Sequence, residues 1–124
     1  MNNYFLRLQF PPSMNTYWRH VGHKVLISKK GREYRLNAIV DVMEQLPRHK
    51  VVFGRVKVRI DLYPPDRRKR DVDNYLKVAL DSLTHANFWD DDSQVDDLRV
   101  VRKGIEKGGR MTILITEIED DSNS

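Results

Sequence analysis

Residues 55–63, RVKVRIDLY, are the stretch that decides the fold class of this chain. The even-numbered residues from 56 to 62 are apolar, and the odd-numbered residues from 55 to 61 are charged. Strict alternation with a period of two predicts a strand with one face in the core and one face in solvent. The solvent face is basic, because Arg55, Lys57 and Arg59 outnumber Asp61 there.

A helix is expected on each side of this strand. Upstream, Ser28 can cap a helix that runs to about Leu46, since apolar residues recur every four positions from 34 to 46 and Pro47 follows. Downstream, two prolines at 64–65 end the strand. A second amphipathic helix is then expected from about Val72 to Ala86.

Three further strands are predicted outside this central unit. Residues 4–10 alternate like residues 55–63, and Pro11 and Pro12 end them. Residues 95–103 and 110–118 indicate two strands joined by a glycine-containing hairpin loop. Residues 11–27 show no clear period, so a long loop is expected there, with a short strand at Val25-Leu26-Ile27.

The element order is therefore β-α-β-α-β-β, and the fold class is α+β. A chain of 124 residues has room for one domain. We expect a mixed sheet of about four strands with two helices packed on it, formed by residues 1–118. Residues 119–124 form an acidic tail that we expect to be frayed.

Charge is distributed unevenly along the chain. Residues 1–70 hold 16 Lys and Arg against 5 Asp and Glu, a net charge of +11. Residues 71–124 hold 6 against 13, a net charge of −7. Such asymmetry suggests a surface for a polyanion beside an acidic cluster.

Several classes of protein are disfavoured by what the sequence lacks. Without cysteine there is no disulfide, thiolate nucleophile or cysteine zinc site. No signal peptide, long apolar span or nucleotide-binding motif is present, so no membrane and no nucleotide cofactor are expected. A cytoplasmic location is the expectation that fits these features.

Acidic residues gather around the second predicted helix. Asp71 and Asp73 stand at its start, and a loop at residues 90–92 holds three consecutive aspartates. If the loop returns to the helix start, three carboxylates could ligate one or two divalent ions that activate water for phosphodiester hydrolysis. Lys77, one turn beyond Asp73, could then stabilise charge on the phosphate. Asp81 extends the same helical face.

A structural interpretation of the same residues stays open. Aspartate at a helix start is an ordinary cap, and Asp73, Lys77 and Asp81 have the spacing of i,i+4 ion pairs. The aspartates of the loop at 90–92 can simply be solvated. The hypothesis of a non-catalytic nucleic-acid-binding protein therefore stands beside that of an enzyme. A phosphohydrolase for small substrates is disfavoured, since it has little use for a large cationic surface.

Four cations, Arg67, Arg68, Lys69 and Arg70, directly precede the acidic pair. Together with the basic face of residues 55–61 they predict a groove for the nucleic-acid backbone. Two other features have alternative interpretations. Phe88-Trp89 is expected to plug the core rather than to stack on a base. Asn15, Tyr17 and Arg19 either reach a DNA strand or only structure their loop.

The sequence resembles the RusA family of Holliday junction resolvases. The most specific motif is PDRRKRDVDN at residues 65–74. The other positions that carry the resemblance are Pro11-Pro12-Ser13, Lys77, Asp81, Phe88-Trp89, Asp91-Asp92, Gln94-Val95 and Lys107-Gly108-Gly109-Arg110. Together they run over nearly the whole chain.

This resemblance implies a homodimer of α+β fold that binds four-way junction DNA. It implies paired symmetric nicks with Mg²⁺, for which Mn²⁺ substitutes. The implied role is in DNA recombination and repair or phage DNA processing, in a bacterium or its prophage. The family's acidic metal ligands fall on Asp71, Asp73 and Asp92, with Asp91 as the second choice, and its essential lysine falls on Lys77.

Overall fold

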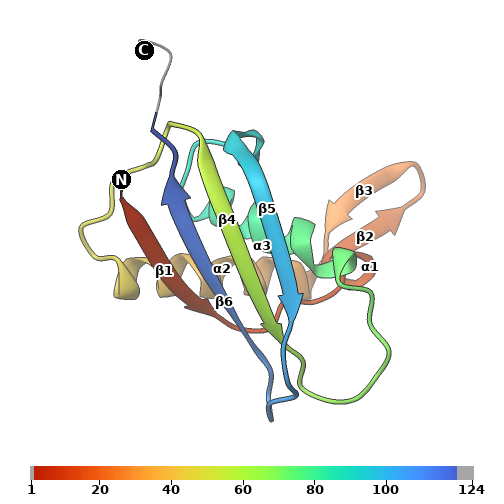
Figure 1. Ribbon diagram of the computed structural model, residues 1–124. Coiled ribbons are helices and arrows are strands. Elements are labelled where there is room, and N and C mark those ends of the chain that lie inside the picture. The colour runs from red at the N-terminus through yellow and green to blue at the C-terminus, as the bar shows by residue number, and fades with distance from the viewer. Residues whose placement is uncertain (1, 120–124) are drawn as a thin grey trace.

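The computed structural model describes residues 2–119, and the fold it shows is α+β. Four strands form a mixed sheet in the order β1-β6-β4-β5. Two long helices lie together behind one face of this sheet (Figure 1). The bounds of the sheet strands and long helices are β1 Asn3–Leu8, α2 Lys29–Gln45, β4 Val56–Tyr63, α3 Asp73–His85, β5 Val95–Arg102 and β6 Arg110–Glu117. The predicted sheet and its two helices are confirmed.

Strand β4 lies at the centre of the structure, as its alternation predicts. Val56, Val58, Ile60 and Leu62 are buried, and the residues between them are exposed or half-buried. β4 pairs antiparallel with β6 and parallel with β5. Because the crossover from β4 to β5 passes through α3, the parallel pairing agrees with the predicted helical connection.

The predicted hairpin between the last two strands is wrong. β5 and β6 do not pair with each other, because β4 lies between them. Their connection instead follows the end of β4, where Lys103 N donates to Leu62 O over 2.7 Å and Glu106 N donates to Pro64 O over 2.9 Å. The glycines of this connection serve a turn, since Gly108 and Gly109 have φ of 82° and 69°.

Helix α2 begins where its capping residue predicts. The Ser28 side chain accepts a hydrogen bond from Gly31 N, and Leu46 is the C-cap. Gly31 is required in this first turn by close packing. A Cβ at this position would lie 2.6 Å from Tyr17 O and 2.7 Å from Ile27 Cγ1.

The region expected to be a long loop is folded. It contains a helical turn, α1 (Met14–Tyr17), followed by a hairpin of β2 (Trp18–Val21) and β3 (Lys24–Ile27). Gly22, with φ of 60°, lies in the turn of that hairpin. Most hairpin residues are exposed, so the apolar alternation that reveals a half-buried strand is missing here. Of this hairpin, only the short strand at Val25-Leu26-Ile27 is expected from sequence, and it is confirmed within β3.

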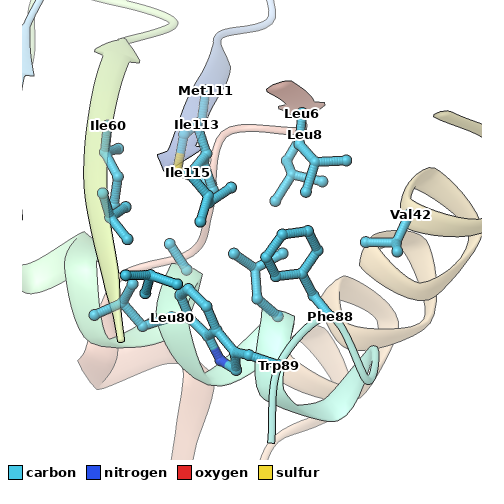
Figure 2. Packing of buried hydrophobic residues seen from close by; sticks show 14 of the residues in the cluster. Leu6, Leu8, Val42, Ile60, Leu80, Phe88, Trp89, Met111, Ile113 and Ile115 are labelled. Atoms are coloured by element: carbon cyan, nitrogen blue, oxygen red, sulfur yellow. The ribbon is translucent and has the colours of Figure 1, made fainter. Parts of the chain in front are cut away.

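The main core lies between the sheet and the helices (Figure 2). Phe88 and Trp89, just after α3, point into it among residues of β1, β6 and α3. Their exposed fractions are 0% and 1%, which confirms that this pair plugs the core. The indole nitrogen of Trp89 donates to Thr84 Oγ1 over 2.8 Å.

Two further points concern the limits of this fold. Of the predicted acidic tail, residues 120–124 lie outside the described residues. Among residues 2–119, no helix is long and apolar enough to cross a membrane.

Candidate functional site

Helix α3 and a short 3-10 helix, η1 (Asp92–Gln94), bring two of the predicted site residues together. Lys77 Nζ lies 3.3 Å from Asp92 Oδ2. The lysine side chain is 62% exposed and the aspartate side chain 22% exposed, so the pair lies at the surface. The aspartate loop therefore returns to α3 at Lys77, one turn beyond Asp73, whereas the predicted acidic site depends on its return to the helix start beside Asp71 and Asp73.

Asp71 and Asp73 lie at the start of the same helix, and both are exposed. Neither acts as its N-cap: that position belongs to Val72, and no side chain makes a capping hydrogen bond. Lys77 pairs with Asp92, and within residues 2–119 no ion pair joins it to Asp73. Capping and i,i+4 pairing therefore do not account for these two carboxylates.

Asp91, the second choice as a ligand, has a structural task. Its carboxylate accepts a hydrogen bond from Ser93 N over 3.1 Å, and its own N–H donates to Gln94 Oε1 over 2.9 Å. This capping box begins η1. The hydrogen bonds from Ser93 hold the pKa of Asp91 below its usual range. Asp92, the next residue, is left to face Lys77.

The carboxylates suit a hard divalent cation by their chemistry, since Mg²⁺ prefers oxygen ligands and keeps several waters. In the described part of the chain, no three His, Asp or Glu side chains are already grouped as a metal site. The cation closest to Asp92 is the ammonium of Lys77. Suitable oxygen donors are therefore present on Asp71, Asp73 and Asp92. The carboxylate of Asp92 already forms an ion pair with Lys77.

Asp81 does not extend the acidic face in the way its spacing suggests. Its carboxylate Oδ2 accepts hydrogen bonds from the Tyr17 hydroxyl and from Arg35 Nη2, the latter over 2.8 Å. Tyr17 is fully buried, and burial, followed by the bond to Asp81, raises its pKa to about 12. Tyr17 therefore structures the protein and does not reach toward DNA.

Arg35 is a residue of this network that sequence reasoning missed. It projects from the middle of α2, 46 positions before Asp81. No local spacing connects two residues that far apart. Only the packing of α1 and α2 on α3 brings them together.

The basic run divides into exposed and supporting residues. Arg67, Arg68 and Lys69 are exposed. The side chain of Arg70 is only 14% exposed, and its Nη1 lies 2.8 Å from Asp66 Oδ1. Its guanidinium also lies 5.6 Å from the centre of the Phe10 ring. Arg70 therefore braces the loop, although the sequence places it with the DNA-binding cations.

The single groove predicted from the run and from strand 55–63 is in fact two hollows. One contains Arg68 and Lys69 and lies beside α1 and α2. The other contains Lys57 and Arg59 of β4 with Arg99 of β5. The second lies on the sheet, whose outer face turns away from the helices, because alternate residues of a strand point to opposite faces (Figure 1).

Comparison with known proteins gives a consistent result. A family model described as endodeoxyribonuclease RusA matches residues 9–116. The chain is 45% identical to a crossover junction endodeoxyribonuclease of Enterobacteria phage HK97, over 96% of this chain and 98% of that protein. It is 43% identical to the protein so named in Shigella sonnei and 42% identical to that of Escherichia coli K12, in each case over 98% of this chain and 100% of the relative.

Proposed function

Because the chain belongs to the RusA family of endodeoxyribonucleases, we propose that it cleaves four-way DNA junctions as a crossover junction endodeoxyribonuclease. This is the activity named for relatives that match it over nearly their full length. It acts in DNA recombination and repair.

We infer that Asp71, Asp73 and Asp92 hold Mg²⁺, with Mn²⁺ as a substitute. The observation that carries this inference is that η1 lies against α3, where Lys77 contacts Asp92. The exposed carboxylates of Asp71 and Asp73 do not cap the helix and are available as ligands. When bound, the ion polarises the phosphodiester and lowers the pKa of the attacking water.

Lys77 has two partners in this proposal. In the free protein its ammonium neutralises Asp92. With DNA bound, the same ammonium contacts the scissile phosphate and stabilises the negative charge that develops there. A flexible, exposed lysine can make this change, because an exposed ion pair is worth only about 0.2–1 kcal/mol.

Paired symmetric nicks require two active sites on one junction. We propose that the protein acts as a homodimer, since a two-fold axis presents identical sites to the two equivalent strands. Each subunit then supplies its own Asp71, Asp73, Asp92 and Lys77.

The test uses a synthetic four-way junction, Mg²⁺ and the full chain. Paired nicks are expected from the unaltered protein and none from Asp73→Asn, while binding of the junction persists. Asp97→Asn is the matched control, because this exposed aspartate lies on β5 beside the outer hollow of the sheet. No cleavage by the unaltered protein with any divalent metal would refute the proposal.

A second measurement separates an enzyme from a non-catalytic DNA-binding protein. If the aspartates are only structural, EDTA and Asp71→Asn leave all measured properties unchanged. If they form the site, Asp71→Asn binds the junction more tightly at equal salt, because it removes negative charge near the phosphates. Weaker binding by Asp71→Asn would contradict the assignment.

A further inference from the structure

A groove of about 430 Å³ lies between the start of α2 and the loop that leads into α3. The residues that line it are Phe10, Pro11, Pro12, Ser13, Thr16, Lys30, Arg68, Lys69, Arg70 and Tyr75. None of these lining residues is acidic, and four are cations.

Both walls of the groove are held in place. On the loop side, Arg70 is bonded to Asp66, and the rings of Phe10 and Tyr75 pack with their centres 5.0 Å apart. On the helix side, Ser28 Oγ donates to Thr16 O over 2.6 Å, which ties α1 to the start of α2. The groove is therefore formed before any ligand arrives.

Three of the four cations are exposed, namely Lys30, Arg68 and Lys69. Arg68 is 83% exposed and has only a distant acidic partner, Asp66, at 3.8 Å. Lys30 and Lys69 form no ion pair within residues 2–119. Positive charge from two distant parts of the chain thus converges on one hollow, and Asp66 partners only the two arginines.

The groove opens beside the proposed cleavage site. Arg70, at its edge, is followed directly by Asp71. Tyr75 lines it from α3, two residues beyond Asp73. Two lining residues, Arg70 and Tyr75, thus flank Asp71 and Asp73 in the chain, which relates the groove to the acidic residues at the helix start.

We propose that this groove binds the phosphodiester backbone of one DNA strand next to the bond that is cut, with Lys30 as a phosphate contact. The proposal rests on the function proposed above and extends it to a residue outside the basic run. The recognised ligand is a phosphate chain, so the groove supplies affinity and position without reading sequence. Lys30 belongs to α2 and Lys69 to the loop, so the two lysines hold the strand from different segments.

The test measures the affinity for a labelled four-way junction in EDTA across a series of salt concentrations. Each phosphate contact that is lost should flatten the slope of log K against log salt by about 1. We expect each of the variants Lys30→Gln and Lys69→Gln to flatten the slope by about 1. The double variant should flatten it by about 2. Lys30→Glu should weaken binding further, because it adds repulsion.

Lys50→Gln is the matched control. Lys50 is exposed and lies beyond the C-terminal end of α2, whereas Lys30 lies in the first turn of that helix. The same loss of charge there should leave the slope unchanged. Thermal melting of each variant checks the fold, which exposed substitutions should not alter.

The outcomes separate this proposal from the proposed function. The proposed phosphate contact is refuted if Lys30→Gln and Lys30→Glu have the same salt slope as Lys50→Gln. This holds even if the protein still nicks junctions. If the slope flattens but no metal supports nicking, the groove stands and the proposed function fails. A loss of affinity that depends on junction sequence would also contradict a backbone contact.

Discussion

The ammonium of Lys77 on α3 lies 3.3 Å from the carboxylate of Asp92 on η1. The two ends of this contact are fifteen positions apart in the sequence, and the core residues Phe88 and Trp89 anchor the chain between them. The ion pair therefore depends on a packed core. Its formation shows that the aspartate loop lies beside α3. It also means that one proposed metal ligand is already neutralised by a cation of the protein.

The first prediction concerns this competition. Lys77→Met should bind Mn²⁺ more tightly, because Asp92 loses the cation that shares its charge. An exposed pair is worth about 0.2–1 kcal/mol, so the gain is up to about fivefold. Titration calorimetry with Mn²⁺ measures it, with Lys50→Met as control. The same variant should lose nicking activity. Weaker or unchanged Mn²⁺ binding by Lys77→Met would argue against Asp92 as a ligand.

The network of Arg35, Tyr17 and Asp81 supplies the second prediction. Arg35→Met should lower the free energy of unfolding by about 1–3 kcal/mol, because it leaves a largely buried carboxylate without its cation. Urea unfolding measures this loss. Arg67→Met is the control, since Arg67 is exposed in the loop before α3. Equal midpoints for the two variants would show that the network adds nothing to stability.

The third prediction uses two glycines with opposite surroundings. Alanine is favoured over glycine in a helix by about 1 kcal/mol. Gly31→Ala should nevertheless destabilise the protein, because the new methyl group meets the backbone oxygen of Tyr17 at 2.6 Å. A Cβ at Gly104 meets nothing within 4 Å, so Gly104→Ala should be close to neutral. Urea midpoints compare them, and a stabilised Gly31→Ala protein would disprove the close approach.

The fourth prediction concerns alkaline pH. Burial raises the pKa of Tyr17 from 10.0 to about 12 and also raises the pKa of Tyr34. The folded state thus favours the protonated phenols. Their contribution to stability is complete below pH 10 and is lost as pH rises through 10 toward 12. The free energy of unfolding should fall over this interval.

Tyr17→Phe supplies the check on that pH dependence. The variant lacks one of the shifted phenols, so its stability should decline less steeply above pH 10. Absorbance of tyrosinate should likewise rise later in the folded protein than in urea. An identical alkaline decline in variant and unaltered protein would mean that the Tyr17 phenol is not coupled to folding.

Local patterns in the sequence determined the elements of the sheet and the family. The alternation of residues 55–63 marks β4, Ser28 marks the start of α2, and the motif at residues 65–74 carries the resemblance to RusA. Each is a signal read within one segment, through a period, a cap or a motif. Strand β2 and its pairing with β3 do not follow from the sequence, because these exposed strands carry no such period.

The tertiary structure alone decided which elements meet. In the folded protein, β4 lies between β5 and β6 and Arg35 forms an ion pair with Asp81. Lys30 lies beside the basic loop. The tertiary structure also placed the cations of the predicted groove in two hollows, one beside α1 and α2 and one on the sheet. Such contacts join residues far apart in the chain, and the packing of the whole core selects them. A local pattern fixes the face a residue occupies, and only packing fixes its partner.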